Sequence, residues 1–221
     1  MNLTKIFEKK PAAARLDGFF SLITVLNQRS RPDRLKDFEQ EASRVGITDY
    51  VTVNAVEDPN SYASFNRSVL FILETFVNTG FDRLLFLEDD VVFSDGVQEK
   101  FMQAARELPE EWDMIYLGCN IIGQNVKPYS EHLAITTGAW TTHAVGMTRE
   151  IARVIVDSKP NPEEGMMDDW FARNIHPSRR SFVCRPMLAV QRPGFSDLWG
   201  RPTDYSGIFK EANKKICGPG F

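Results

Sequence analysis

Strand-length apolar runs alternate with amphipathic segments of helical length over the first half of this chain, and this alternation constrains the fold more than any other feature. The run FFSLITVL at 19–26 is continuous and apolar, as expected for a strand buried on both faces. Apolar residues then recur at helical spacing, at Leu35, Phe38, Ala42 and Val45. Strands that alternate with helices of this length need crossover connections, which predicts a mostly parallel sheet.

The helix after the first strand has sequence signals at both ends, because Pro32 suits a first turn and Gly46 suits a C-terminal cap. Further strands are predicted at YVTVNAV, RLLFL and DMIYLG, with helices near 64–78 and 97–108. Strand-like TTHAVGM and SFVCRP flank the helical segments TREIARVIVDS and MMDDWFARNI. The predicted fold class is therefore α/β, with a Rossmann-like, mostly parallel mixed sheet flanked by helices.

The length and composition favour one globular domain. The chain has 221 residues, of which 43% are hydrophobic and 25% charged. We expect a single domain over 1–221, with a core at about 18–200 and an irregular tail over 201–221, because little pattern remains beyond Phe195. Periodicity also fades over 119–137, which we interpret as a hairpin or a mobile loop.

Charge and cysteine content narrow the partners and the compartment. A net charge of −4 argues against nucleic acid as the main partner. Cys119, Cys184 and Cys217 lack paired spacing, so we expect buried or reduced thiols. The first twenty residues contain no apolar run of signal-peptide or membrane-span length. We expect a cytoplasmic protein of a bacterium, or of a host cell if viral, in which peripheral membrane contact stays open.

Three consecutive carboxylates, Glu88, Asp89 and Asp90, follow the predicted strand RLLFL. Adjacent acids repel one another and are rarely buried unless paired or bound to a cation. Ligands of open α/β sheets bind at the carboxyl ends of the strands, where these residues fall. Their oxygens suit Mg²⁺ or Mn²⁺, ions that typically also bind substrate phosphates. Alternatively, the side chains splay to opposite faces and one aspartate caps the next helix.

A second acidic pair, Asp168 and Asp169, begins the predicted helix MMDDWFARNI. Two interpretations stay open: acids that favour the helix dipole, or a general base. His143 lies in an apolar, strand-like segment, where it is either structural or a contact to a metal ion or a substrate. The sequence motifs of zinc metalloproteases, P-loop nucleoside triphosphatases, serine hydrolases and dinucleotide oxidoreductases are absent.

Taken in order, six segments resemble glycosyltransferase family 25, which includes bacterial lipooligosaccharide galactosyltransferases and collagen galactosyltransferases. They are LITVLNQRSRPDRLKDF, FLEDDVVF, EEWDMIYLG, TTHAVGMTREIARVI, MMDDWF and RPMLAVQRPGFSDL. The resemblance spans about 20–198, and LEDDV followed by WDMIYLG is its most specific part. It implies a GT-A-like fold and a nucleotide-sugar-dependent hexosyltransferase of lipopolysaccharide or other glycan biosynthesis.

The resemblance also implies roles for particular residues. Asp90 is expected to be the first metal ligand, with Glu88 and Asp89 as ribose or metal partners, and His143 completes our candidate metal set. The motif VLNQRSRPDR is expected near the donor pocket, through Asn27, Arg29 and Arg34. Many relatives carry a Ser-His pair ahead of the acidic motif, whereas this chain has SFNRS, with Asn66 near that position.

The expected function is metal-dependent transfer of a hexose, galactose or glucose, from a UDP-sugar to a glycan or protein-linked hydroxyl, with inversion. Mn²⁺ or Mg²⁺ is the expected cofactor, and Asp168 or Asp169 the expected base. The segment 119–137 and the tail with Ser196, Asp197 and Trp199 are expected to close over the substrates.

Three alternatives stay open at this point. Trp140, Trp170 and Trp199 either stack on sugar rings or pack in the core. The domain as a whole is alternatively a non-catalytic module that binds a glycan or a nucleotide. A receiver-like signalling domain would also place clustered acids at strand ends, although such domains are shorter than this chain.

Overall fold

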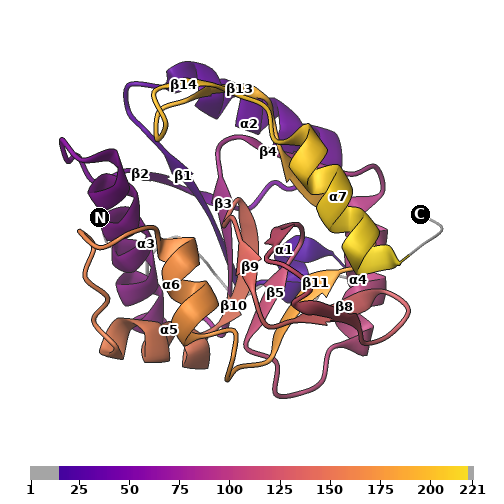
Figure 1. Ribbon diagram of the computed structural model, residues 1–221. Coiled ribbons are helices and arrows are strands. Elements are labelled where there is room, and N and C mark those ends of the chain that lie inside the picture. Colours follow the sequence, from indigo (N-terminus) through magenta and orange to yellow (C-terminus); the bar gives the residue numbers. More distant parts are fainter. Residues whose placement is uncertain (1–14, 219–221) are drawn as a thin grey trace.

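The computed structural model describes residues 15–218, and its central sheet carries helices on both faces (Figure 1). Within these residues the sheet has eight strands in the order β2-β1-β3-β10-β5-β11-β8-β7. Six of the eight run in one direction, and β10 and β8 run against them. This confirms the predicted α/β class with a mostly parallel mixed sheet. The strands are β1 Leu22–Asn27, β2 Val51–Asn54, β3 Arg83–Glu88, β5 Met114–Tyr116, β7 Val126–Pro128, β8 Leu133–Thr136, β10 Ala144–Thr148 and β11 Ser181–Cys184.

Three short antiparallel pairs form separate two-stranded sheets within the described residues. They are β4 Val91–Phe93 with β12 Ala189–Gln191, β6 Asn120–Ile121 with β9 Ala139–Trp140, and β13 Gly194–Ser196 with β14 Arg201–Thr203. The segment 119–137 contains the β7–β8 hairpin, so the hairpin interpretation of this region is confirmed.

The helices follow the predicted apolar stripes. Their bounds are α1 Leu16–Phe19, α2 Pro32–Val45, α3 Ser61–Val77, α4 Val97–Glu107, α5 Arg149–Asp157, α6 Met167–Asn174 and α7 Ser206–Cys217. As predicted, α2 starts at Pro32 and is capped at its C-terminus by Gly46, whose φ of 73° is left-handed. The side chain of Asn60 caps α3 by accepting from two backbone N–H groups.

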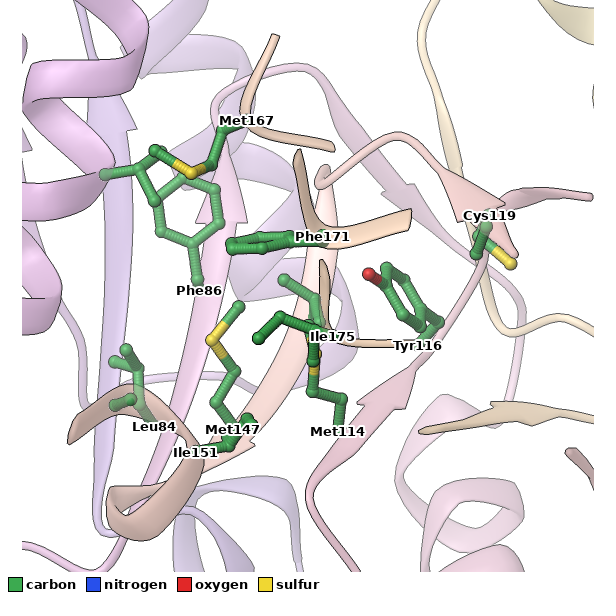
Figure 2. Close-up of a cluster of buried hydrophobic side chains, with 14 of the residues drawn as sticks. Leu84, Phe86, Met114, Tyr116, Cys119, Met147, Ile151, Met167, Phe171 and Ile175 are labelled. Carbon is green, nitrogen blue, oxygen red and sulfur yellow. The ribbon is translucent and has the colours of Figure 1, made fainter. Parts of the chain in front are cut away.

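Alternate residues of the strands build two separate cores, one on each face of the sheet. Figure 2 shows the face covered by α5 and α6, where Phe86 of β3 and Met147 of β10 meet Phe171 of α6. On the other face, Leu85 and Ile115 pack in the core that includes residues of α2 and α4. Full burial of a side chain such as Phe86 or Phe171 stabilises the fold by about 1.5–3 kcal/mol.

The C-terminal region corrects one expectation. The tail over 201–221 is not irregular in its described part, because it forms β14 and α7. Phe209, Ala212 and Ile216 recur at helical spacing and are buried. Cys119, Cys184 and Cys217 are free and buried, as predicted.

The chain ends limit two further expectations. Residues 219–221, and residues 1–14 with most of the segment inspected for a signal peptide, lie outside the described residues. Within residues 15–218, no helix combines the length and apolarity that a bilayer crossing requires.

The strand order brings several chain segments to one edge of the sheet. β1 pairs with β2 on one side and with β3 on the other, so the chain crosses over β1 between them. Ligands of open α/β sheets bind at such a switch point, at the carboxyl ends of the strands. Because β10 is antiparallel to β3, with Ala144 opposite Leu87, the residues before β10 lie beside Glu88.

Candidate functional site

A cavity of about 480 Å³ opens at this edge of the sheet. Its size lies within the range of about 300–1,000 Å³ that is common for small-molecule sites. Its walls come from the β1–α2 loop, the end of β3, the β9–β10 connection, the start of α6 and the segment from β12 to β14. Its lining includes three arginines, Arg31, Arg34 and Arg192, and eight acidic residues, Asp33, Asp37, Glu88, Asp89, Asp90, Asp168, Asp169 and Asp197.

The acidic motif forms the end of β3 and the turn that follows it. Glu88 is the last residue of β3, and Asp89 and Asp90 form the turn before β4. All three line the cavity. Neither aspartate caps the next helix, because α4 is preceded by Gly96. The alternative in which these side chains splay and cap a helix is therefore wrong.

Arg34 is the cation that pairs with this motif. Its guanidinium forms salt bridges with both Asp89 and Asp90, at 2.9 Å to Asp90 Oδ2. Asn27 Nδ2 donates to Asp89 Oδ2 at 2.7 Å, and Gln191 Nε2 donates to Asp90 Oδ2 at 3.4 Å. Asn27 and Arg34, both predicted near the donor, thus contact the acidic motif. Arg34 carries one positive charge, which is not enough to neutralise both Asp89 and Asp90 when they are ionised.

Burial, more than the neighbouring charges, raises the pKa values of the three acids in this motif. Burial, and after it the nearby Asp90 carboxylate, raise the pKa of Glu88 to about 8, although Thr142 Oγ1 donates to Glu88 at 2.8 Å. Burial raises the pKa of Asp89 to about 6, with Arg34 opposing the shift. Burial also raises the pKa of Asp90. A bound cation would favour the ionised forms of all three.

The donor atoms of this motif fit a hard divalent cation. Asp90 Oδ1 is buried and has no hydrogen-bond partner among residues 15–218. Carboxylate oxygens are the ligands that Mg²⁺ and Mn²⁺ prefer. In the described part of the chain, a group of three close metal-ligating side chains occurs elsewhere, at Glu107, Glu131 and His132. A cation at the β3 motif would therefore need water or substrate oxygens to complete its coordination.

The strand pair β13–β14 is held against the arginines of the cavity. Arg31 Nη1 lies 2.5 Å from Asp197 Oδ2, and Arg34 Nη1 lies 3.4 Å from the same oxygen. Ser61 Oγ also donates to the carbonyl oxygen of Leu198 at 3.3 Å. Figure 1 shows β13 and β14 beside α2, at the top of the view. The structure thus places the tail residues Ser196, Asp197 and Trp199 in the cavity wall.

Three consecutive residues, from the end of β9 into its connection with β10, each donate a hydrogen bond to a different acid of the cavity. Trp140 Nε1 donates to Asp169 Oδ1 at 2.7 Å, and Thr141 N donates to Asp168 Oδ2 at 2.9 Å. Thr142 Oγ1 donates to Glu88, as described above. This segment, 140–142, therefore links the acids of β3 to the acids of α6.

Thr141 adopts a backbone conformation that is unfavourable for its residue type. Its φ of 73° lies in the left-handed region, which a β-branched residue rarely adopts. Such a conformation costs about 1–3 kcal/mol and persists only where the surrounding structure holds it. Here the hydrogen bonds of residues 140–142 hold it.

Asp168 and Asp169 lie in the first turn of α6, where acids interact favourably with the helix dipole, and both also line the cavity. Burial raises the pKa of Asp168, whose Oδ1 accepts from Asp169 N at 2.8 Å. Asn66 holds the loop that leads into α6. It donates at 2.8 Å to the carbonyl oxygens of Pro162 and Gly165, and it accepts from Met167 N at 3.0 Å.

Three predicted site residues are not part of the cavity lining, although one of them, Asn27, still contacts Asp89. Arg29 is exposed on the β1–α2 loop. His143 is buried in the core, with its ring centroid 5.0 Å from that of Phe209, and burial lowers its pKa to about 4. The backbone carbonyl of His143 accepts from Glu88 N at 3.0 Å, but His143 does not line the cavity, and its metal role stays a prediction.

The tryptophans differ in their positions. Trp140 and Trp199 are 38% and 46% exposed and line the cavity, whereas Trp170 packs partly buried against the core. Arg31, Gln191 and Thr142 were not predicted as site residues, although all three lie in segments that carry the family resemblance. Their positions depend on loop paths and on the register of β10.

No family model matches this sequence, and no curated protein matches it. The solved structures with a similar fold include a glycosyltransferase involved in the glycosylation of the major capsid of PBCV-1. It shares 15% identity at a TM-score of 0.47, covering 79% of this chain and 94% of that one. A Drosophila β-1,4-galactosyltransferase 7, in complex with manganese, UDP-Gal and xylobiose, shares 13% identity at a TM-score of 0.46, covering 88% and 79%.

A UDP-glucose pyrophosphorylase is similar at 10% identity and a TM-score of 0.43, covering 74% of this chain and 72% of that one. The chain is thus distantly similar in fold to glycosyltransferases and sugar nucleotidyltransferases. Membership of family 25 stays a prediction.

Proposed function

We propose that this chain is a cation-dependent glycosyltransferase that moves a hexose from a UDP-sugar to a hydroxyl group of a glycan or protein-linked acceptor. One observation carries the proposal. Two sets of acidic residues with different surroundings line one cavity, and residues 140–142 link them by hydrogen bonds. The sets are Glu88–Asp90 and Asp168–Asp169. Sugar transfer needs both kinds: carboxylates for a cation that binds a diphosphate, and a carboxylate that takes a proton.

The charge of the cavity explains why a cation is part of the proposal. A nucleoside diphosphate is an anion, and acidic residues outnumber arginines in the cavity lining. Asp90 and Glu88 would hold Mn²⁺ or Mg²⁺, which when bound neutralises charge on the departing diphosphate. Arg31 and Arg34 lie next to this position and already bind a carboxylate, that of Asp197. Guanidinium groups bind phosphate oxygens in the same way, so the donor would displace Asp197.

Asp168 is the proposed base. Its two oxygens accept from Thr141 N and Asp169 N, which fixes the carboxylate in place. Its raised pKa makes it a better proton acceptor near neutral pH than an exposed aspartate. In an inverting reaction it takes the proton of the acceptor hydroxyl, whose oxygen attacks the anomeric carbon opposite the leaving diphosphate. Asp169 is the weaker candidate, because its carboxylate is already paired with a cation, the guanidinium of Arg173.

Release of UDP from sugar nucleotides tests this function. The purified chain would be incubated with UDP-galactose or UDP-glucose, with Mn²⁺ or with EDTA, and with a panel of glycan acceptors. We expect UDP release that needs the cation and is lost in Asp90→Asn. Asp95→Asn is the matched control, because the Asp95 side chain is 97% exposed and lies outside the cavity lining. Equal release in EDTA and in both variants would contradict the proposal.

A specific observation favours a second function, a nucleotide- or glycan-binding module without turnover. Arg34 already bridges Asp89 and Asp90, as a permanent substitute for a metal ion would. Such a module would bind UDP equally well in EDTA and would release no UDP from any sugar nucleotide.

A further inference from the structure

The indole of Trp140 lies on the wall of the cavity that carries the proposed base. The side chain is 38% exposed, and its polar Nε1 edge is bound to Asp169 Oδ1 at 2.7 Å. This bond fixes the direction of the ring and leaves only apolar ring surface to meet a ligand. The next residue, Thr141, donates its backbone N–H to Asp168. A ligand that contacts the indole is therefore close to Asp168.

Polar groups suited to hydroxyls flank the ring. Asn120 of β6 is the register partner of Trp140 of β9, and directly opposite residues of an antiparallel pair lie on one face. Asn120 also lines the cavity, and its side-chain amide has no hydrogen-bond partner within the range 15–218. On the other side lies the Asp169 carboxylate. An amide and a carboxylate together offer donors and acceptors to a hydroxyl-bearing ligand.

The charge on this wall argues against an anionic ligand. Asp168 and Asp169 are both acidic. The arginine nearest in sequence, Arg173, lies 3.3 Å from Asp169 Oδ2, and its side chain is 75% exposed. Its charge is therefore partly neutralised and largely in solvent. A ligand with a carboxylate or a phosphate next to Trp140 would meet net negative charge.

We propose that Trp140, Asn120 and Asp169 form an acceptor subsite for an uncharged pyranose. One face of a pyranose carries C–H groups and its rim carries hydroxyls, which matches a flat apolar ring beside an amide and a carboxylate. The sugar stacks on the indole, and one of its hydroxyls reaches Asp168. This last step rests on the proposed function, because only there does Asp168 take the acceptor proton.

Saturation-transfer NMR on the full chain tests the subsite. Each sample contains Mg²⁺, which is diamagnetic, UDP and one probe: methyl β-D-galactopyranoside, methyl β-D-glucopyranoside or methyl β-D-glucuronide. We expect saturation of the ring protons of the two neutral glycosides and a weaker signal for the glucuronide. Trp140→Ala should weaken binding of the neutral glycosides about tenfold, which is the size expected for loss of a good stacking contact. Trp140→Phe should retain part of the signal, since it keeps an aromatic ring.

Phe71→Ala is the control for loss of an exposed aromatic ring, because Phe71 is 51% exposed on α3 and lies outside the cavity lining. Thermal melts show whether each variant is folded. The subsite would be overturned if the neutral glycosides gave no signal with the wild-type chain. It would also be overturned if they gave the same signal with the wild-type chain as with folded Trp140→Ala and Trp140→Phe.

The UDP resonances in the same tubes separate this inference from the proposed function. If saturation is transferred to UDP but not to the glycosides, the transferase proposal stands and the subsite is contradicted. If glycoside binding depends on Trp140 but the chain binds no UDP, the sugar subsite stands and the transferase proposal is contradicted.

Discussion

The two acid groups of the cavity differ in what surrounds them. Glu88, Asp89 and Asp90 follow a buried strand, and their only close cation in the described chain is Arg34. Asp168 and Asp169 begin a helix and accept mainly from neutral donors, the indole of Trp140 and backbone N–H groups. The first group has an excess of negative charge that a cation would stabilise. The second group has a fixed carboxylate, Asp168, that remains able to take a proton.

The largest effect that separates the groups is expected for Asp168→Asn. Loss of a general base lowers the rate of transfer by about 10²–10⁴-fold, because the amide takes no proton. UDP binding should be unchanged, since the cation site lies with the other group. Initial rates and UDP titrations of Asp168→Asn and Asp169→Asn measure both. Transfer that persists in Asp168→Asn would remove Asp168 as the base.

Arg34→Ala should destabilise the fold by about 3 kcal/mol at pH 8, because it leaves two buried carboxylates without their cation. The loss should be smaller at pH 5, since Asp89, with a pKa of about 6, is then mostly protonated. Urea unfolding at the two pH values measures the free energies. Arg29→Ala is the matched control, because Arg29 is exposed, and we expect a change within about 0.5 kcal/mol. Equal losses at both pH values would contradict this account of the charge.

Glu88 should make the fold less stable as pH rises from 6.5 to 8 in EDTA. Its pKa is raised from 4.5 to about 8, so the folded chain holds a proton that the unfolded chain has released. The expected loss over this window is about 1–2 kcal/mol. His143 and His176, whose pKa values fall from 6.5 to about 4, act with the opposite sign but mainly below pH 6.5.

Glu88→Gln keeps an acceptor for Thr142 and removes the titration, so its stability should be nearly flat over the same window. Chemical unfolding of both proteins at closely spaced pH values measures the difference. A wild-type chain as flat as Glu88→Gln would show that Glu88 is ionised throughout.

The smallest effect is expected at Thr141, which links the two groups. Thr141→Gly should raise the free energy of unfolding by about 0.5 kcal/mol, because glycine adopts a φ of 73° without strain. The backbone N–H to Asp168 is retained, so transfer should continue. Thr141→Ala keeps the strain and should bring no gain. Thermal melts of both variants measure this, and a glycine variant less stable than the alanine variant would contradict it.

Local sequence patterns predicted both acid groups because each follows a local rule. The apolar run of β3 places Glu88 at a carboxyl end, and helical spacing places Asp168 in a first turn. Helical spacing at Phe209, Ala212 and Ile216 was equally present in α7, but turn residues around it obscured the pattern.

Local sequence patterns did not predict contacts between distant segments of the chain. Arg31 and Asp197 are 166 residues apart, and nothing local predicts their pairing. Thr142 reaches Glu88 because β10 is antiparallel to β3, a direction that apolar spacing does not encode. His143, which directly precedes β10, is buried in the core and does not line the cavity.

Calorimetric titration of UDP tests the central claim most directly, that the β3 acids hold a cation for a nucleoside diphosphate. The chain would be titrated with Mn²⁺, with EDTA, and with Mn²⁺ in Asp90→Asn. We predict binding with Mn²⁺ that weakens at least about 100-fold in EDTA and in the variant, as expected when a charge-paired ligand is lost. UDP binding of equal strength in all three conditions, or in none, would contradict the claim.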